Sequence, residues 1–501
     1  MKSQDGHVLV MDFGSQYTFL IVRRLRENGA FAILGEELTP SAKAVVISGS
    51  PESVNKADFP APPDNVMESG LPILGICYGF QVLSKLLGGQ VAPSGHPEFG
   101  PTRVKVLDRG ILLRGFPDEF TAWMSHSDEV KAPPPGARVT AVSENGQIAA
   151  WELPERKIFG VQFHPEVAHT ENGALLFRNF IEFAGLKGTW DIMTYVERRK
   201  REVAEQVGDE PVLLALSGGV DSGVLAYFLK EAIGDGQVYP VFVDTGLLKY
   251  GEADRIRRLF SGFRNLKIVD ASREFLSALR GVTDPSAKRR VIGEKFIEVF
   301  SRNASGFRFL GQGTLYPDVV ESGATTKSTS VIKLHHNVGG LPERLGFELV
   351  EPFRELFKDE VREIGRILGV PQEILDRQPF PGPGFAVRIE GEVTSEKVEL
   401  LREVDRIVEE VARKTGVYEK TWQVFPVLPS CMSTGVKGDV GVFGRVIVIR
   451  AVESSDGMTA VPHSLPQDFV REVVSKVTAI PEIVRVLVDV TPKPPATIEF
   501  Y

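Results

Sequence analysis

The residues best suited to chemistry begin with Cys77, one of only two cysteines in the chain. It stands in Gly-Ile-Cys-Tyr-Gly, between an apolar run at 71–76 and a helical pattern. This spacing predicts a nucleophile elbow, where side chains at Gly75 and Gly79 would clash with the neighbouring strand and helix. The helix N-terminus would favour the thiolate, and the backbone N–H of Tyr78 can stabilise an oxyanion. We therefore favour a nucleophile over a cysteine that is buried for packing alone.

A cysteine nucleophile needs a base, and the chain contains His-Pro-Glu twice. The first copy, at 96–98, follows no predicted strand and is interpreted as a surface loop. The second copy, at 164–166, directly follows the predicted strand 157–163, so its side chains should emerge at the end of a sheet. We predict that His164 is the base and that Glu166 orients it.

A second motif is Ser-Gly-Gly-Val-Asp-Ser at 217–222, which also lies between an apolar run and a helical pattern. Backbone N–H groups of such a turn, with the helix N-terminus, form an anion site. The hexapeptide resembles the PP-loop of ATP pyrophosphatase-type enzymes, which cleave ATP to AMP and pyrophosphate while adenylating an acceptor oxygen. On that resemblance the loop binds ATP, and Asp221 helps to place Mg²⁺. The ATP-binding residues predicted in this loop are Ser217, Gly218, Gly219, Val220, Asp221 and Ser222.

Short β-rich runs must position these motifs, and they alternate with helical patterns through the first two-thirds of the chain. Continuous apolar strands with helices between them indicate parallel, doubly wound sheets. The predicted strands of the first unit are 8–13, 44–48, 71–76 and 157–163, and those of the second are 212–216, 238–244 and 265–270.

The last part of the chain differs, with long helical patterns at 394–415 and 467–478 and strands at 445–452 and 483–490. The predicted fold class is therefore α/β, with two doubly wound, mostly parallel-sheet domains followed by a small α+β domain. The predicted domains are 1–187, 188–380 and 381–501.

Composition narrows the class of protein. The 501 residues carry 58 Lys+Arg and 66 Asp+Glu, and a net charge of −8 argues against a nucleic-acid partner. Two cysteines form no disulfide framework, which favours a reducing cytoplasm. The long apolar window at 211–230 is interrupted by a glycine-rich turn and Asp221, so no membrane association is expected.

The segments "GICYG" and "VQFHPEV" together resemble the class-I, triad-type glutamine amidotransferases. The resemblance implies that Cys77 attacks the side-chain amide of glutamine, that His164 shuttles the proton and that Glu166 orients the histidine. It also implies an oxyanion hole made by two backbone N–H groups. One belongs to Tyr78, and the other belongs to Ser50 in "ISGSP".

Six further segments resemble the glutamine-hydrolysing GMP synthetase family: "DFGSQYT", "GQGTLYPDVVES", "HHNVGGLPERL", "ELFKDEVREIG", "RQPFPGPGF" and "KPPATIEF". The family resemblance implies that XMP is adenylated on O2 and that ammonia then displaces AMP to give GMP. It also implies a homodimer built by the C-terminal domain. The XMP-binding residues that it implies are Arg289, Asp439, Lys493 and Glu499, and the further ATP-binding residues are Val243, with Asp244 beside it, and Lys358.

Two other classes of protein remain open from the sequence. One is a different ATP pyrophosphatase-type ligase, such as an NAD⁺ synthetase-like or argininosuccinate synthetase-like enzyme, which the C-terminal segments oppose. The other is a non-catalytic binding or regulatory protein, which the intact triad and the complete phosphate loop oppose.

Overall fold

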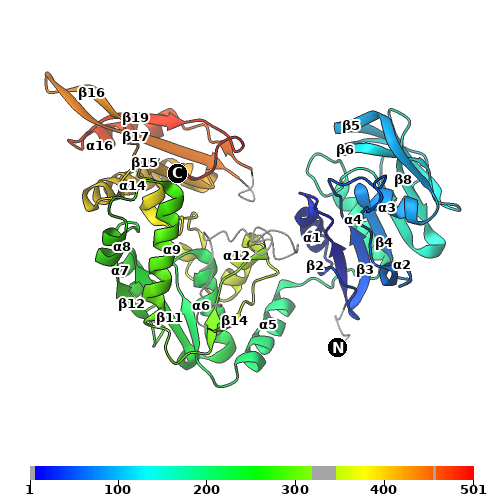
Figure 1. Cartoon of the computed structure of the whole chain (residues 1–501), viewed down its shortest axis with the longest axis horizontal. Coiled ribbons are helices and arrows are strands. Elements are labelled where there is room, and N and C mark those ends of the chain that lie inside the picture. The colour runs from blue at the N-terminus through cyan, green and yellow to red at the C-terminus, as the bar shows by residue number, and fades with distance from the viewer. Residues whose placement is uncertain (1–5, 317, 319–345, 455–458) are drawn as a thin grey trace. The chain divides into compact units, whose positions relative to one another are not determined.

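The computed structural model describes residues 6–316, 318, 346–454 and 459–501 (Figure 1). The chain divides into two compact units, residues 1–195 and 196–501, and each is described by itself. The segment 335–345 and part of 311–322, which carry two of the family resemblances, lie outside the described residues. Within the part of the chain that is described, no helix has the length and apolar character needed to cross a bilayer.

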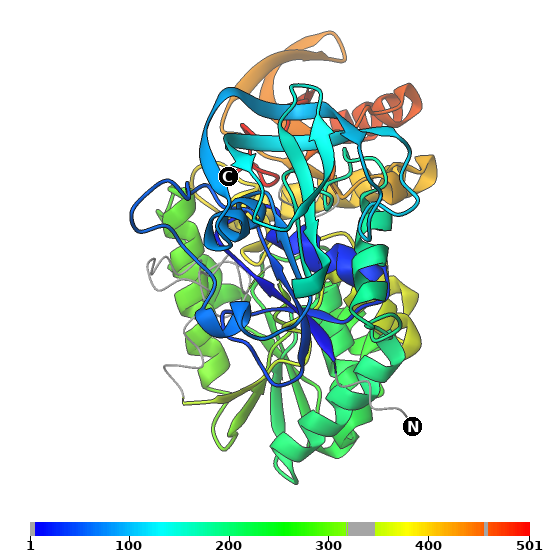
Figure 2. The same ribbon diagram turned by 90° about the vertical axis from the view of Figure 1, so that its right-hand side faces the viewer.

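The first unit contains a nine-stranded sheet in the order β2-β1-β3-β4-β9-β8-β7-β5-β6 (Figure 2). Its parallel part is β2 (Ala32–Leu34), β1 (His7–Met11), β3 (Ala42–Ile47), β4 (Ile73–Ile76) and β9 (Ile158–Val161). Helix α1 (Thr18–Glu27) packs against α4 (Gly173–Phe183), and α3 (Tyr78–Leu86) packs on β4 and β9. Strands β1, β3 and β4 are mostly apolar and, apart from the exposed Lys43 of β3, buried, as expected of parallel strands. The doubly wound prediction is confirmed for this part.

The remaining four strands of this sheet are antiparallel, and the sequence prediction did not include them. They are β8 (Ile148–Leu153), β7 (Arg138–Ser143), β5 (Gln90–Val106) and β6 (Glu119–Ala132). Along β6 buried and more exposed residues alternate, so the strand lacks the continuous apolar run that marks the parallel part.

The second unit begins with a parallel five-stranded sheet in the order β12-β11-β10-β13-β14, as the prediction of a doubly wound sheet requires. The strands are β10 (Val212–Ala215), β11 (Val238–Asp244), β12 (Lys267–Asp270), β13 (Phe309–Gly311) and β14 (Glu348–Val350). The helices that accompany it include α6 (Val220–Ile233), α7 (Glu252–Leu259), α8 (Ser272–Ala278), α9 (Pro285–Ser301), α12 (Lys358–Ile367) and α13 (Gln372–Leu375).

The C-terminal part is α+β, as predicted. Its strands are β15 (Gln423–Val427), β16 (Met432–Lys437), β17 (Val440–Glu453), β18 (Val461–Pro462) and β19 (Ile483–Asp489), and β17 pairs with all four others. Its helices are α14 (Ser395–Thr415), α15 (Val417–Lys420) and α16 (Gln467–Thr478). Other short or linking helices in the chain are α2 (Asp64–Met67), α5 (Ile192–Val207), η1 (Pro154–Arg156), η2 (Asp235–Gln237) and η3 (Gly384–Val387).

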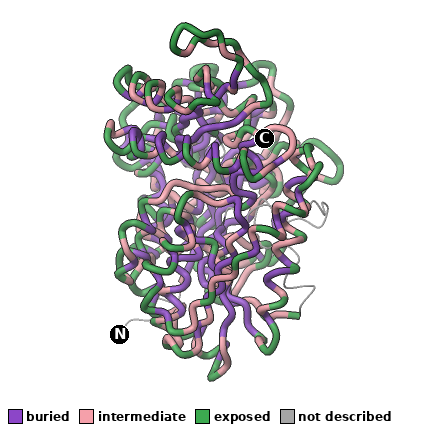
Figure 3. Tube along the Cα trace, turned by 90° about the vertical axis from the view of Figure 1, so that its left-hand side faces the viewer, coloured by how far each residue is buried: buried purple, intermediate pink, exposed green. Residues whose placement is uncertain are grey.

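One hydrophobic core joins the parallel sheet of the second unit to the C-terminal part (Figure 3). Leu213 and Val241 of the sheet belong to the same buried cluster as Leu401, Ile447 and Phe469. Residues 196–501 therefore form one compact unit, and the division into domains at 188–380 and 381–501 stays a prediction.

Candidate active sites

The turn between β4 and α3 has the geometry of a nucleophile elbow. Cys77 has φ 54° and ψ −101°, a conformation that L-residues rarely adopt and that marks functional turns. A Cβ atom on Gly75 would lie 2.4 Å from the carbonyl oxygen of Gly79, and one on Gly79 would lie 2.3 Å from that of Ile47. Both glycines are therefore required where strand and helix approach, as the sequence predicts.

The structure brings His164 and Glu166 to this elbow. Nδ1 of His164 lies 2.7 Å from Oε1 of Glu166, and both side chains are buried. Burial opposes the charged imidazole, but the carboxylate of Glu166 and the interaction with Cys77 outweigh it, so the pKa of His164 is raised well above its ordinary value. The arrangement is that of a nucleophile, a base and a group that orients the base.

The two residues predicted for the oxyanion hole lie beside these side chains. Tyr78 is the first residue of α3, where a backbone N–H has no acceptor within the helix. Ser50 follows Gly49, and a Cβ atom on Gly49 would lie 3.3 Å from Cε1 of His164. Among the described residues, those other than glycine with positive φ are Cys77, Lys157, Asn172 and Asp439, so Ser50 has an ordinary backbone conformation.

The interpretation of the first His-Pro-Glu copy as a surface loop is wrong. Residues 96–98 lie in strand β5 and not in a surface loop. His96 is exposed, but Glu98 is buried and its Oε2 lies 3.1 Å from Nε2 of His126. The error arose because Pro93, Gly95 and Pro97 obscure the strand pattern, and because the partner of Glu98 belongs to a different strand.

Hydrogen bonds between its own residues hold the phosphate loop between β10 and α6. The N–H of Ser217 donates to Oγ of Ser222 at 3.1 Å, and the N–H of Gly219 donates to Oγ of Ser217 at 3.2 Å. Gly218 has φ +78°, which favours glycine. Since α6 begins at Val220, its free N–H groups and the loop form an anion site.

Asp221 and Lys358 come together at this loop. Nζ of Lys358 lies 3.5 Å from Oδ2 of Asp221, and Oδ1 of Asp221 is buried with no hydrogen-bond partner among the described residues. An unpaired anionic oxygen next to a phosphate site fits Mg²⁺, which proteins commonly hold by one or two carboxylates together with substrate phosphates. No group of three or more acidic, histidine or cysteine side chains forms a ready metal cage within the described ranges.

Val243 and Asp244 end strand β11, the neighbour of β10. Val243 is buried, and Oδ1 of Asp244 accepts the N–H of Gly246 at 2.9 Å. Both residues thus lie at the carboxyl edge of the sheet from which the phosphate loop also leaves, where ligands bind to open α/β sheets.

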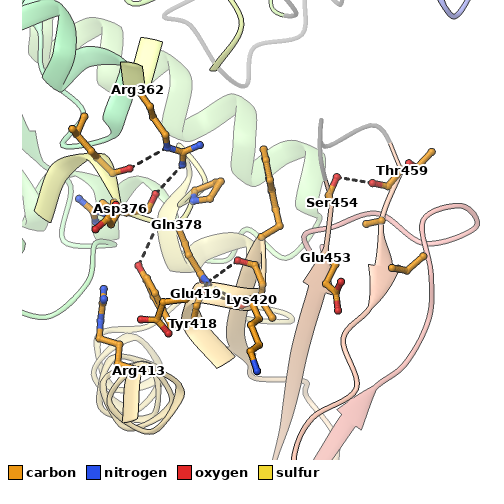
Figure 4. Close-up of a pocket in the computed structure, with 17 residues that line it drawn as sticks. Arg362, Asp376, Gln378, Arg413, Tyr418, Glu419, Lys420, Glu453, Ser454 and Thr459 are labelled. Carbon is orange, nitrogen blue, oxygen red and sulfur yellow. Dashed lines mark hydrogen bonds between the residues drawn. The ribbon is translucent and has the colours of Figure 1, made fainter. Parts of the chain in front are cut away.

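Arg377 is a residue at the phosphate loop that the sequence prediction missed. Its Nη1 donates to the carbonyl of Gly218 at 2.7 Å, and its Nη2 lies 2.8 Å from Oε2 of the buried Glu252. Arg377 also lines a cavity of about 810 Å³, drawn in Figure 4. The other lining residues are Arg362, Arg413 and those at 375–379, 418–422, 453–454 and 459–461. The segment 377–385 was used only as a family resemblance, and no role was predicted for Arg377.

Two predicted XMP-binding residues converge on the C-terminal segment. Nη2 of Arg289 donates to the backbone oxygen of Tyr501. Glu499 accepts from Nε and Nη2 of the buried Arg388, at 2.9 and 2.8 Å. Arg388 was not predicted, because its partner lies 111 residues away in the sequence.

The other two predicted XMP-binding residues lie elsewhere in the same unit. Lys493 exchanges backbone hydrogen bonds with Ala460, at 2.8 and 3.1 Å. Asp439 is exposed at the tip of the hairpin formed by β16 and β17 and has φ 63°. The structure therefore does not place Asp439 in the cluster formed by Arg289 and Glu499.

The sheet, the elbow and the buried triad of the first unit define a class-I glutamine amidotransferase. In agreement, the glutamine amidotransferase class-I family matches residues 9–183, and the GMP synthase C-terminal domain family matches residues 396–500. A solved glutamine amidotransferase from Thermotoga maritima matches 46% of this chain and 98% of its own at 21% identity, with a TM-score of 0.29.

Similarity to named relatives extends over almost the whole chain. The glutamine-hydrolysing GMP synthase of Thermomicrobium roseum is 49% identical over 98% of this chain and 96% of its own length. That of Thermus thermophilus is 49% identical over 98% of this chain and 100% of its own, and that of Aeropyrum pernix is 48% identical over 98% of each. The chain belongs to the glutamine-hydrolysing GMP synthase family.

Proposed function

We propose that the chain makes GMP from XMP, glutamine and ATP, releasing glutamate, AMP and pyrophosphate. The observation that carries this proposal is the presence of a complete buried triad and a closed phosphate loop in a chain that is similar to GMP synthases over nearly its full length.

In the first unit the side chains act on the amide of glutamine. Cys77 attacks the amide carbon, and His164 takes the thiol proton and delivers it to the leaving ammonia. The raised pKa of His164 suits it to hold that proton between the two transfers. The N–H groups of Tyr78 and Ser50 stabilise the oxyanion, and water then hydrolyses the thioester to glutamate.

In the second unit the phosphate loop acts on ATP. The N–H groups of Val220 and the start of α6, with the hydroxyls of Ser217 and Ser222, hold the pyrophosphate as O2 of XMP attacks the α-phosphorus. Lys358 balances the negative charge of the pyrophosphate. Asp221 would hold Mg²⁺, which when bound supplies further positive charge to the phosphates.

XMP recognition is assigned to the C-terminal part of the second unit. Arg289 and Lys493 supply cations suited to a phosphate or ribose, and Glu499 supplies a carboxylate that Arg388 orients. Asp439 is retained as a candidate, and its place at a hairpin tip means that only a loop movement or a second copy can bring it to XMP.

We propose a homodimer, and the surface of the β16–β17 hairpin supports this proposal. Val436 and Phe443 lie on the same face of this hairpin and are 74% and 69% exposed, an apolar surface that a second copy of this chain would cover. Analytical ultracentrifugation tests this assignment: Phe443→Ser should shift the protein towards the monomer. A wild-type monomer at micromolar concentration would contradict it. We also assign the enzyme to the cytoplasm, since Cys77 and Cys431 are both free.

Release of AMP and pyrophosphate from Mg-ATP, with ammonium or glutamine and with or without XMP, tests the proposed function. We expect release that requires XMP and yields GMP with either nitrogen donor. Cys77→Ala should lose glutamine use but retain ammonium use. Release with deamido-NAD⁺ or with citrulline and aspartate, and none with XMP, would assign the chain to a different ligase.

A further inference from the structure

A second buried carboxylate–imidazole pair lies in the first unit, outside the catalytic triad. Glu98 and His126 face each other across β5 and β6, and each side chain is only 2% exposed. Oε1 of Glu98 also accepts from Ser143 at 2.6 Å and from Asn145 at 2.9 Å. A buried carboxylate with this many donors is a built feature of the fold and not an incidental contact.

Both ring nitrogens of His126 have partners. Nε2 contacts the carboxylate of Glu98 at 3.1 Å, and Nδ1 contacts the carbonyl oxygen of Asp128 at 2.9 Å. The imidazole therefore links Glu98 on β5 to the backbone of Asp128 on β6. Burial raises the pKa of Glu98, but the bonds from His126, Ser143 and Asn145 outweigh it and leave this pKa below its ordinary value. Glu98 and His126 therefore form a buried hydrogen-bonded pair.

The strand segment that carries His126 borders the nucleophile. Sγ of Cys77 donates to the carbonyl oxygen of Ser125 at 3.6 Å. The carbonyl oxygen of Asp128 accepts Nε2 of Gln81, one helical turn beyond Cys77, at 2.9 Å. The carboxylate of Asp128 accepts the hydroxyl of Ser53, in the loop that follows the oxyanion residue Ser50. Residues 125–128 thus contact both the elbow and the oxyanion loop.

This segment needs an anchor because regular pairing is interrupted opposite it. Pro93 pairs with Asp128 and Glu98 pairs with His126, so residues 94–97 bulge opposite the single residue Ser127. Gln147 holds the bulge by donating to the carbonyl of His96 at 2.7 Å. A bulge next to an active site re-aims the chain around it. The hydrogen bond between Glu98 and His126 joins the two strands at the point where backbone pairing resumes.

We propose that Glu98 and His126 are positioning residues for the glutaminase reaction, fixing residues 125–128 against the elbow so that glutamine is held correctly for attack by Cys77. This rests on the proposed function of the first unit. The pair touches no reacting atom; it acts through Ser125 and Asp128.

Kinetics of Glu98→Gln and His126→Asn test the proposal. An amide at 98 presents an NH₂ group to one of its present donors, so the pair is broken while side-chain volume is kept. A displacement of about 1 Å near a reacting centre costs on the order of 100-fold, and we expect KM for glutamine to rise about 10- to 100-fold. The value of kcat should change less, since the contact of His164 with Glu166 is untouched. GMP formation with ammonium should keep its wild-type rate.

Glu119→Gln is the matched control, because Glu119 pairs with Arg103 at 2.6 Å across the same two strands but is 51% exposed. It should leave both activities unchanged. The ¹⁵N chemical shifts of the His126 ring, assigned in histidine-labelled protein with His126→Asn, should change in Glu98→Gln. They should stay at their wild-type values in Glu119→Gln.

Wild-type glutamine kinetics in both variants would overturn the proposal, as would a parallel loss of the glutamine and ammonium activities. Unchanged ¹⁵N shifts of the His126 ring in Glu98→Gln would also overturn it. Cys77→Ala separates these results from the proposed function: if that variant still hydrolyses glutamine, the assignment of the first unit fails. If it does not, while Glu98→Gln retains normal kinetics, only the positioning role fails.

Discussion

Gly79→Ala tests whether the elbow geometry is required for glutamine hydrolysis. The added Cβ would lie 2.3 Å from the carbonyl oxygen of Ile47 and 2.9 Å from its carbon, whereas ordinary contacts begin near 3.4 Å. The obstacle is backbone, which cannot rotate away, so β3 and α3 must separate by about 1 Å. Because α3 begins at Tyr78, this shift moves both Cys77 and the N–H of Tyr78.

The size of the effect follows from that displacement. Overpacking of this kind costs about 1–3 kcal/mol of unfolding free energy, which lowers the Tm of a unit of this size by about 2–12 °C. Misplacement of the nucleophile by about 1 Å should lower kcat for glutamine hydrolysis about 100-fold. The synthetase reaction with ammonium uses the second unit and should be unchanged.

The assay measures glutamate release, pyrophosphate release with ammonium, and thermal unfolding on the same preparations. Gly95→Ala is the control, because a Cβ atom there meets nothing within 4 Å and should leave all three unchanged. Glutamine hydrolysis by Gly79→Ala within twofold of the wild-type rate would refute the reasoning, since the elbow would then tolerate a shift that the geometry forbids.

Three further variants test the electrostatics of the two sites. Because Glu166 raises the pKa of His164 against the effect of burial, Glu166→Gln should lower that pKa. A raised pKa of His164 stabilises the fold below about pH 6.5, and this stabilisation is lost as the pH rises through the folded-state pKa. In denaturant melts at pH 5–9, the variant's loss of unfolding free energy relative to the wild type should therefore shrink as the pH rises. A loss that grows with pH would contradict this. Arg377→Met removes a partner of the buried Glu252 and should lower the unfolding free energy by about 3 kcal/mol. It should also raise KM for ATP and leave glutamine hydrolysis unchanged. An unaltered KM for ATP would count against a role of Arg377 at the phosphate loop. Arg388→Met should raise KM for XMP more than KM for ATP, and equal effects on both would show a general loss of structure instead.

Local spacing explains what the sequence predicted well. The elbow and the phosphate loop are each built within a few consecutive residues, where a strand, a glycine turn and a helix follow one another. Cys77 and Asp221 could therefore be selected as candidates from their immediate neighbours, and their roles stay predictions. His164 and Glu166 were found because both follow one strand. The parallel strands were visible because both of their faces are buried, which makes them apolar throughout.

Distance in the sequence explains what was missed. Arg377 contacts Gly218 across 159 residues, and Arg388 contacts Glu499 across 111. Neither arginine has a local pattern that distinguishes it from a solvated one. Glu98 was misinterpreted because its partner His126 lies on another strand, 28 residues away. The long antiparallel strands β5 and β6 escaped because buried and more exposed residues are interspersed along them, so neither has a continuous apolar run.

The difference between local and distant contacts also explains how the chemistry is divided between the two units. Each unit holds its reactive turn at the carboxyl end of a parallel strand that lies inside its own sheet, β4 in the first and β10 in the second. The contacts that shape each turn are made within that unit: Gly79 with Ile47 in the first, and Gly218 with Arg377 in the second. A substitution that distorts one turn should therefore leave the other intact. Ammonium as nitrogen donor separates the two reactions in one preparation, because it bypasses Cys77 and still requires the phosphate loop.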